Sequence, residues 1–309
     1  MLTELADGAH TIEVVAQDQA GNVDPTPAML TFTVTRFHVT LVEPAAGDTV
    51  PAGLQLVRGT VAAAGGDVGV TVNGVAAAVH GNTFAALVPV TGATTHLRVV
   101  ATTAAGATTT RETPVTVTTA PDSPFLLVAS PRSGLAPLTA SVALLGDAVS
   151  ATVEVDFDGD GTVDFTGSRL DGQAFTYAHP GLYSPRVTVI DAQGQRITVF
   201  GVIQVFDQAA LDTLLQGKWS AMKDALRRGD VPQALSHVAT RSRARYQEAF
   251  TVLAPDLAAI DSILTGLTFV GVRGLEAIFE MTRTDATIAK SFDVRFQVDT
   301  DGLWRLKAF

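Results

Sequence analysis

The chain of 309 residues contains no cysteine, which excludes disulfide bridges and metal sites built on thiolates. Aromatic residues make up only 6% of it and charged residues only 17%, below the quarter usual for soluble domains. No apolar run reaches the length of a membrane span. The first residues also lack the basic and apolar segments of a signal peptide, so any export signal would lie outside this sequence.

The charge is negative overall, at −10, and is unevenly distributed. Residues 211–309 hold 13 basic and 12 acidic side chains, whereas residues 1–210 hold 8 basic and 19 acidic ones. No basic patch is interleaved with aromatic residues. This distribution argues against nucleic acid as a partner.

The most concentrated chemistry lies in Asp156-Phe-Asp-Gly-Asp-Gly-Thr-Val-Asp164. Alternation along an extended segment places Val153, Val155 and Phe157 on a core face, with Asp156 and Asp158 facing outward. The two glycines allow a sharp bend, so that the later aspartates converge on the same side. Oxygen ligands on alternate residues around a glycine are what calcium requires. The predicted ligands are the side chains of Asp156, Asp158, Asp160 and Asp164 and the backbone carbonyl of Thr162.

Crowding of carboxylates supports a bound cation. Two carboxylates about 6 Å apart in water repel by roughly 0.7 kcal/mol. The four aspartates form six such pairs, so their mutual repulsion costs up to about 4 kcal/mol. No lysine or arginine lies between residues 151 and 168 to offset that cost. The twelfth position of a helix–loop–helix calcium loop would be Gly167 rather than glutamate, which predicts weak affinity. The alternative is a solvated acidic turn, because Asp and Gly are ordinary turn formers.

The turn and strand signals predict a multidomain chain of β-sandwiches followed by an α+β domain. The expected units are a partial module of two strands, a complete sandwich, a short proline-containing linker, a second sandwich and a helix-plus-sheet domain: residues 1–36, 37–119, 120–124, 125–207 and 208–309. In the first sandwich, Asn73-Gly74 between two valine-rich runs is a strong hairpin signal. His80 and His96 are expected at strand ends or on a solvent face.

Two stretches resemble known accessory modules. Asp7-Gly-Ala-His-Thr-Ile-Glu-Val-Val-Ala-Gln-Asp-Gln-Ala-Gly-Asn22 resembles the closing strands of bacterial immunoglobulin-like repeats, without the early strands of such a repeat. Val-Thr-Val-Asn-Gly-Val-Ala-Ala-Ala-Val at 70–79, with Phe84 and Val88-Pro-Val90, resembles the immunoglobulin-like B domain of glucodextranase. That resemblance implies an accessory β-sandwich rather than a catalytic domain.

A third stretch resembles a PKD domain. The lead Ser130-Pro-Arg-Ser-Gly-Leu-Ala-Pro-Leu138, the acidic loop, Tyr177…Pro180-Gly181…Tyr183 and Val187-Thr-Val-Ile-Asp191 together carry this resemblance. It implies a seven-stranded sandwich of an extracellular protein. Where such modules usually read Asp-Phe-Gly-Asp-Gly, this chain has an insertion that resembles a calcium-type variant.

After Val205 the apolar period becomes helical, with Leu211, Leu215, Met222 and Leu226 on one stripe. Helices followed by four strands indicate an α+β domain. The order, with its Asp301-Gly-Leu-Trp-Arg-Leu finish, resembles the nuclear-transport-factor-like cone fold, which includes enzymes and binding domains. The candidate polar groups of the cone are His237, Tyr246, Glu280 and Arg283. The basic cluster of Arg241, Arg243 and Arg245 is interpreted as a solvated face.

The sequence therefore predicts a non-catalytic segment of a secreted or cell-surface bacterial protein. Its modules would act as calcium-stiffened spacers that present a C-terminal interaction domain to a protein or carbohydrate. One alternative is a carbohydrate-binding accessory region of an extracellular enzyme, and a third is a ligand-binding or enzymatic cone. Residues 1–36 are expected either to pair with strands from a neighbouring chain or to be the least ordered part.

Overall fold

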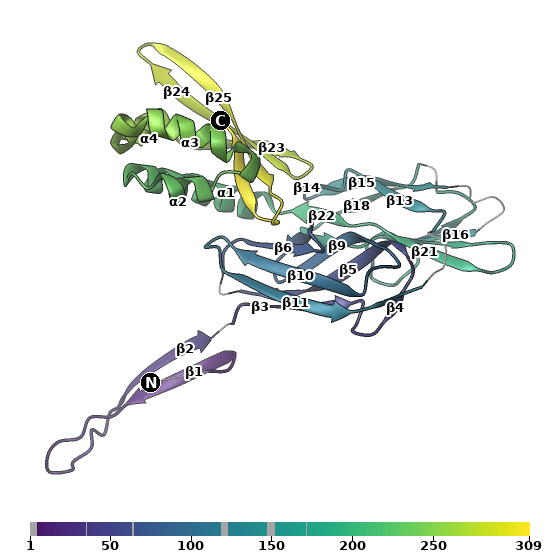
Figure 1. Ribbon diagram of the computed structural model, residues 1–309, viewed down its shortest axis with the longest axis horizontal. Coiled ribbons are helices and arrows are strands. Elements are labelled where there is room, and N and C mark those ends of the chain that lie inside the picture. Colours follow the sequence, from purple (N-terminus) through teal and green to yellow (C-terminus); the bar gives the residue numbers. More distant parts are fainter. Residues whose placement is uncertain (1–4, 35, 64, 119–122, 147–151, 171) are drawn as a thin grey trace.

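The computed structural model describes residues 5–34, 36–63, 65–118, 123–146, 152–170 and 172–309. About half of these residues form strands, nearly all of them antiparallel, and the helices gather near the C-terminus (Figure 1). The expected linker at 120–124 lies largely outside the described residues. The apolar cores separate into groups that fall within residues 39–115, 127–205 and 206–306. The exact division into modules stays a prediction.

The N-terminal part is a two-stranded hairpin of β1 (Gly8–Val14) and β2 (Ala28–Val34). It projects away from the rest of the chain (Figure 1). Ile12 lies opposite Leu30, and His10 lies opposite Phe32 and stacks on it, so one face is apolar. No third described strand pairs with this sheet. Its apolar face is uncovered, since Val14 is 62% exposed and Leu30 61%.

We expect the hairpin to open readily in dilute solution, because two strands with one uncovered apolar face are only marginally stable in water. Amide hydrogen exchange should be fast at Val14 and Phe32, whereas Val57 and Val88, buried in the next core, should be strongly protected. Protection at Val14 and Phe32 comparable to that of the core would contradict this expectation. Protection that rises with protein concentration would instead indicate pairing with a neighbouring chain.

Residues 38–117 form a sandwich of two four-stranded antiparallel sheets with a short parallel pair at one end. The strands of the first sheet are, in order, β3 (His38–Glu43), β5 (Gly53–Ala62), β9 (Thr83–Val90) and β8 (Ala78–His80). Those of the second sheet are β11 (Thr108–Pro114), β10 (His96–Thr103), β6 (Val68–Val72) and β7 (Val75–Ala76). The short pair consists of β4 (Thr49–Val50) and β12 (Thr116–Val117). The predicted hairpin is confirmed, with φ of 48° at Asn73 and 81° at Gly74. His80 and His96 lie at strand ends and are exposed, as expected.

Residues 126–206 form a second group of sheets around two apolar clusters. The first sheet contains, in order, β13 (Leu126–Ser130), β15 (Leu138–Leu145) and β18 (Ala174–Tyr177). The second contains β14 (Ser133–Leu135), β22 (Ile203–Phe206) and β19 (Gly181–Tyr183). The third contains β17 (Phe165–Gly167), β16 (Thr152–Asp156), β20 (Arg186–Ile190) and β21 (Arg196–Phe200). β21 and β22 are separated at Gly201, whose N–H donates to the carbonyl of Pro185. The chain thereby passes from one sheet to another.

The C-terminal part packs helices against a four-stranded antiparallel sheet. The helices are α1 (Gln208–Arg227), α2 (Val231–Ser236), α3 (Arg243–Val252) and α4 (Ile260–Ile263), with 3₁₀ turns at Thr240–Ser242 and Ala254–Ala259, and the strands are β23 (Leu267–Arg273), β24 (Glu276–Asp285), β25 (Ile288–Val298) and β26 (Trp304–Ala308). The predicted apolar stripe of α1 is buried. Among the described residues, no helix is long and apolar enough to cross a membrane.

The C-terminal part also contacts both sandwiches, at a place that we call the junction. Nζ of Lys218 in α1 lies 2.8 Å from a carboxylate oxygen of Asp67, just before β6. The same carboxylate accepts the backbone N–H of Trp304. The backbone of Gly69 lies so close to that of Gly302 that a Cβ on either residue would meet backbone atoms. The two sandwiches are joined in turn by a hydrogen bond of 2.7 Å from Gln204 to the carbonyl of Val79.

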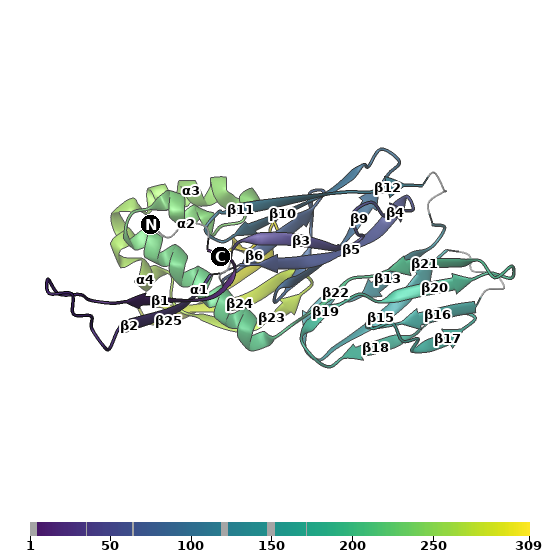
Figure 2. The ribbon, with the colours of Figure 1, turned by 90° about the horizontal axis from the view of Figure 1, so that it is seen from below.

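The junction changes the expected picture of modules strung in a row. Residues 38–117 and 126–206 lie side by side, and α1 begins directly after β22, the last strand of the second group (Figure 2). This arrangement follows from contacts between residues far apart in the sequence, which local patterns do not encode.

Candidate metal centre

The acidic loop joins β16 to β17, at the end of a strand that is buried inside a sheet. Val153, Val155 and Phe157 are buried, as their alternation predicts. The loop turns at Gly159 and Gly161, whose φ angles are 83° and 102°. A Cβ at Gly159 would also meet the carbonyl of Ser184, so the loop depends on glycine there.

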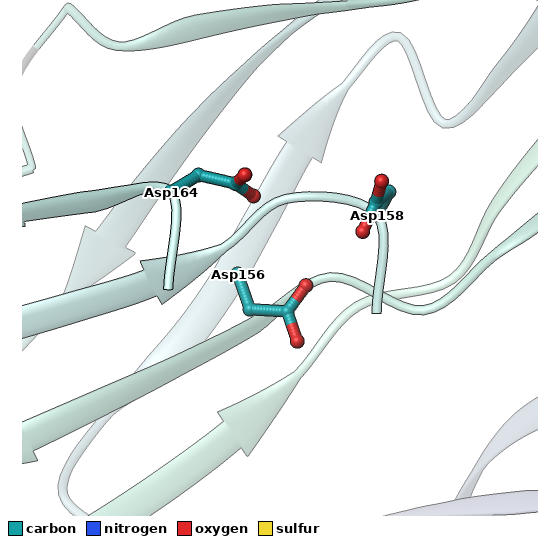
Figure 3. A group of neighbouring side chains, drawn as sticks. All are labelled: Asp156, Asp158 and Asp164. Carbon is teal, nitrogen blue, oxygen red and sulfur yellow. The ribbon is translucent and has the colours of Figure 1, made fainter. Parts of the chain in front are cut away.

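Three of the predicted ligands converge. Asp156, Asp158 and Asp164 each offer a carboxylate oxygen, and these oxygens lie within 4.8 Å of one another. Figure 3 shows the three side chains turned toward a common space. All the donor atoms are carboxylate oxygens, which suit a hard cation such as calcium or magnesium rather than zinc or copper.

The fourth predicted carboxylate, Asp160, does not join this group of described side chains. One carboxylate oxygen of Asp160 accepts the backbone N–H of Thr162 at 2.6 Å, and both residues are exposed at the tip of the loop. The structure thus brings together three of the four carboxylates that the spacing predicted, and the role of the Thr162 carbonyl stays a prediction. The fourth carboxylate forms a local turn instead, a common role for Asp in loops.

Asp156 differs from expectation because it is buried, with only 3% of its surface exposed. Its carboxylate accepts the N–H groups of Gly159 and Gly161 at 2.7 and 2.9 Å. Nε of Arg186 lies 3.1 Å from it, on the neighbouring strand β20. No basic residue lies within the loop, so the sequence of the loop did not show that the sheet places Arg186 beside Asp156. The antiparallel pairing of β16 with β20 places Arg186 opposite Asp156.

The cluster remains electronegative in spite of Arg186. Burial raises the pKa of Asp158, and the charges of Asp160, Asp164 and Asp156 raise it further. Burial and the charge of Asp158 also raise the pKa of Tyr177. Arg186 offsets one of the three converging negative charges, so that two remain. This is the charge that a divalent cation neutralises.

Two neighbours hold the loop in place. The Tyr177 hydroxyl donates a hydrogen bond of 2.8 Å to the carbonyl of Phe157. The backbone N–H of Phe157 in turn donates to Asp164 at 2.7 Å. The strand end and the last aspartate of the loop are therefore tied together by the fold itself.

The candidate groups of the C-terminal domain do not form a comparable site. Burial, together with the nearby charges of Lys218 and Arg305, lowers the pKa of His237 to about 4. The hydroxyl of Tyr246 bonds the backbone of Phe309, and Glu280 accepts a hydrogen bond from Ser291. Arg283 lies over the ring of Phe292. The four groups serve four separate local contacts.

The space between the helices and the sheet of this domain is filled by large buried side chains, among them Trp219, Phe250, Phe279 and Phe296. Of the basic cluster, Arg241 and Arg245 are exposed and Arg243 donates to the carbonyl of Val238. That arrangement agrees with a solvated face.

No protein-family model and no curated protein matches the sequence. Solved structures do match. The fibronectin(III)-like modules of CbhA from Clostridium thermocellum are 17% identical over 54% of this chain and 94% of theirs, with a TM-score of 0.19. Dimeric latent PorU from Porphyromonas gingivalis is 12% identical over 64% of this chain and 24% of its own, with a TM-score of 0.28.

The SGBP-B protein of a Bacteroides ovatus mixed-linkage glucan utilization locus, solved with a mixed-linkage heptasaccharide, is 15% identical. That match covers 66% of this chain and 54% of the other, with a TM-score of 0.19. At these identities and TM-scores, nothing that these proteins bind or do carries over to this chain. The tandem β-sandwich architecture is observed in the chain itself. The more specific resemblances to glucodextranase B, PKD and nuclear-transport-factor-like domains stay predictions.

Proposed function

We propose that the loop of residues 156–164 binds calcium and stiffens one module of a non-catalytic, modular protein of the cell surface or extracellular space. The observation that supports this most directly is the convergence of Asp156, Asp158 and Asp164 within 4.8 Å. Because the loop fits a complete calcium loop only in part, we expect an affinity in the range of extracellular modules, about 10⁻⁴ to 10⁻³ M.

A non-catalytic role is part of the proposal. Burial and the nearby cations Lys218 and Arg305 disfavour the protonated form of His237, and the other candidate groups of the C-terminal domain are engaged in local contacts. The carbohydrate alternative requires exposed aromatic rings on which a sugar can stack. Both tryptophans, Trp219 and Trp304, are buried in the C-terminal core.

Calcium is expected to stabilise the protein measurably. At a calcium concentration a hundred times the dissociation constant, the gain in unfolding free energy is about 2.7 kcal/mol. Calorimetric titration of metal-stripped protein should show one site, and the melting temperature should rise with calcium. Asp158→Asn, which removes one charge from the converging group, should weaken binding about tenfold or more.

Asp160→Asn is the matched control, because Asp160 lies in the same loop but outside the converging group. It should change the affinity far less than Asp158→Asn does. An equal loss from both variants would show instead that the loop rearranges to use all four carboxylates, as the spacing predicted. An unchanged melting temperature and no heat of binding in 10 mM calcium would refute the calcium site.

A further inference from the structure

A cleft of about 870 Å³ opens at the junction, where both sandwiches and the C-terminal domain meet. One wall is the alanine-rich segment of β7 and β8, which are edge strands of two different sheets, and another is Val202. The third wall is formed by Leu211 and Leu214 of α1 and by Trp304 of β26. The volume falls within the range of small-molecule sites, which lie preferentially between domains.

The polar groups of the cleft are unequally engaged. Of its carboxylates, Asp67 pairs with Lys218 and Asp207 caps α1 by accepting the N–H of Ala210. Two basic side chains, Arg132 and His80, also line the cleft and are exposed. Neither has a side-chain hydrogen bond or ion pair within the described residues. The cleft therefore offers apolar walls and two basic groups, while both of its carboxylates are already engaged.

We propose that this cleft binds a small amphipathic anion. Its aliphatic body would lie along the alanine and leucine walls, and its carboxylate would meet Arg132 and His80. Arginine suits this role because its planar donors match a carboxylate. A neutral sugar fits less well, since the aromatic rings in the lining, Phe206 and Trp304, are only 8% and 6% exposed. This site is separate from the calcium loop and does not depend on it.

The test uses the whole chain and three probes with similar apolar tails: decanoate, decylammonium and decyl glucoside. Trp304 lines the cleft, so intrinsic fluorescence reports binding, and calorimetry provides an independent readout. We expect saturable binding of decanoate, at least tenfold tighter than that of the cationic and the sugar-headed probe. Arg132→Gln should weaken decanoate binding about tenfold, the usual effect of losing a charge-assisted hydrogen bond.

Arg111→Gln is the matched control, because Arg111 is an exposed arginine of β11 that does not line the cleft, and it should leave the affinity unchanged. Ala210→Phe places a ring at an exposed position of α1 that lines the cleft. It should reduce binding severalfold without lowering the melting temperature. The proposal is overturned if no probe binds saturably below its micelle-forming concentration. It is also overturned if decyl glucoside binds as tightly as decanoate, or if Arg132→Gln binds like the parent protein.

Discussion

Replacing Asp67 by alanine is expected to lower the unfolding free energy of the C-terminal domain by about 3–5 kcal/mol, the usual cost of breaking a buried ion pair by removing one partner. Asp67 and Lys218 are each only 10% exposed at the side chain. Without the carboxylate, the ammonium group of Lys218 stays buried with no compensating charge, and the N–H of Trp304 loses its acceptor. Urea denaturation followed by tryptophan fluorescence measures the effect, since both tryptophans lie in that domain.

Two comparisons make this result interpretable. Glu112→Ala removes one partner of the exposed pair with Arg98, whose side chains are more than half exposed, and should cost less than about 1 kcal/mol. The double variant Asp67→Leu with Lys218→Met should recover much of the loss, because it removes both buried charges together. A loss within 1 kcal/mol for Asp67→Ala would show that the junction opens and hydrates Lys218 at little cost.

Acidification is expected to destabilise the same domain through His237. Burial, helped by Lys218 and Arg305, lowers the pKa of His237 to about 4 in the folded protein. The unfolded chain, with an ordinary histidine pKa near 6.5, takes up the proton first. The contribution of His237 to the free energy of unfolding is therefore fully present above about pH 6.5. It falls by up to about 3 kcal/mol as the pH decreases toward 4. The urea midpoint should fall over this window.

The variant His237→Gln should flatten this pH dependence, whereas His96→Gln should not, because His96 is exposed at the start of β10. Asp299, which shares Arg305 with this region, keeps its charge throughout the window. Burial acts to raise its pKa, but hydrogen bonds from Thr240, Thr300 and Arg305 outweigh burial and lower the pKa to about 2. Parallel pH profiles for the parent protein and His237→Gln would assign the acid sensitivity to other groups.

Local features of the fold followed directly from the sequence. The alternation of Val153, Val155 and Phe157 correctly identified a buried strand face, since side chains on a strand point to opposite sides by turns. The Asn73-Gly74 turn was predictable because few other residues adopt positive φ at both positions. The apolar stripe of α1 was equally readable, because residues three and four apart on a helix lie on the same face.

Within the acidic loop, by contrast, spacing alone did not show which carboxylates converge. It correctly grouped Asp156, Asp158 and Asp164, but it did not distinguish Asp160, whose carboxylate closes a turn on Thr162. Which oxygens converge depends on how the loop is held by Tyr177 and Ser184, two residues of later strands and turns.

The sequence by itself determined the β-rich class, the helical C-terminal region and the place of the acidic loop, because each rests on periodicity or turn chemistry within a short stretch. Only the tertiary structure decided that Arg186 covers Asp156, that Asp67 pairs with Lys218, and that three parts of the chain enclose a cleft. A sequence pattern shows that a face is apolar or charged, but the surface that covers it is set by strand register and by the docking of distant segments.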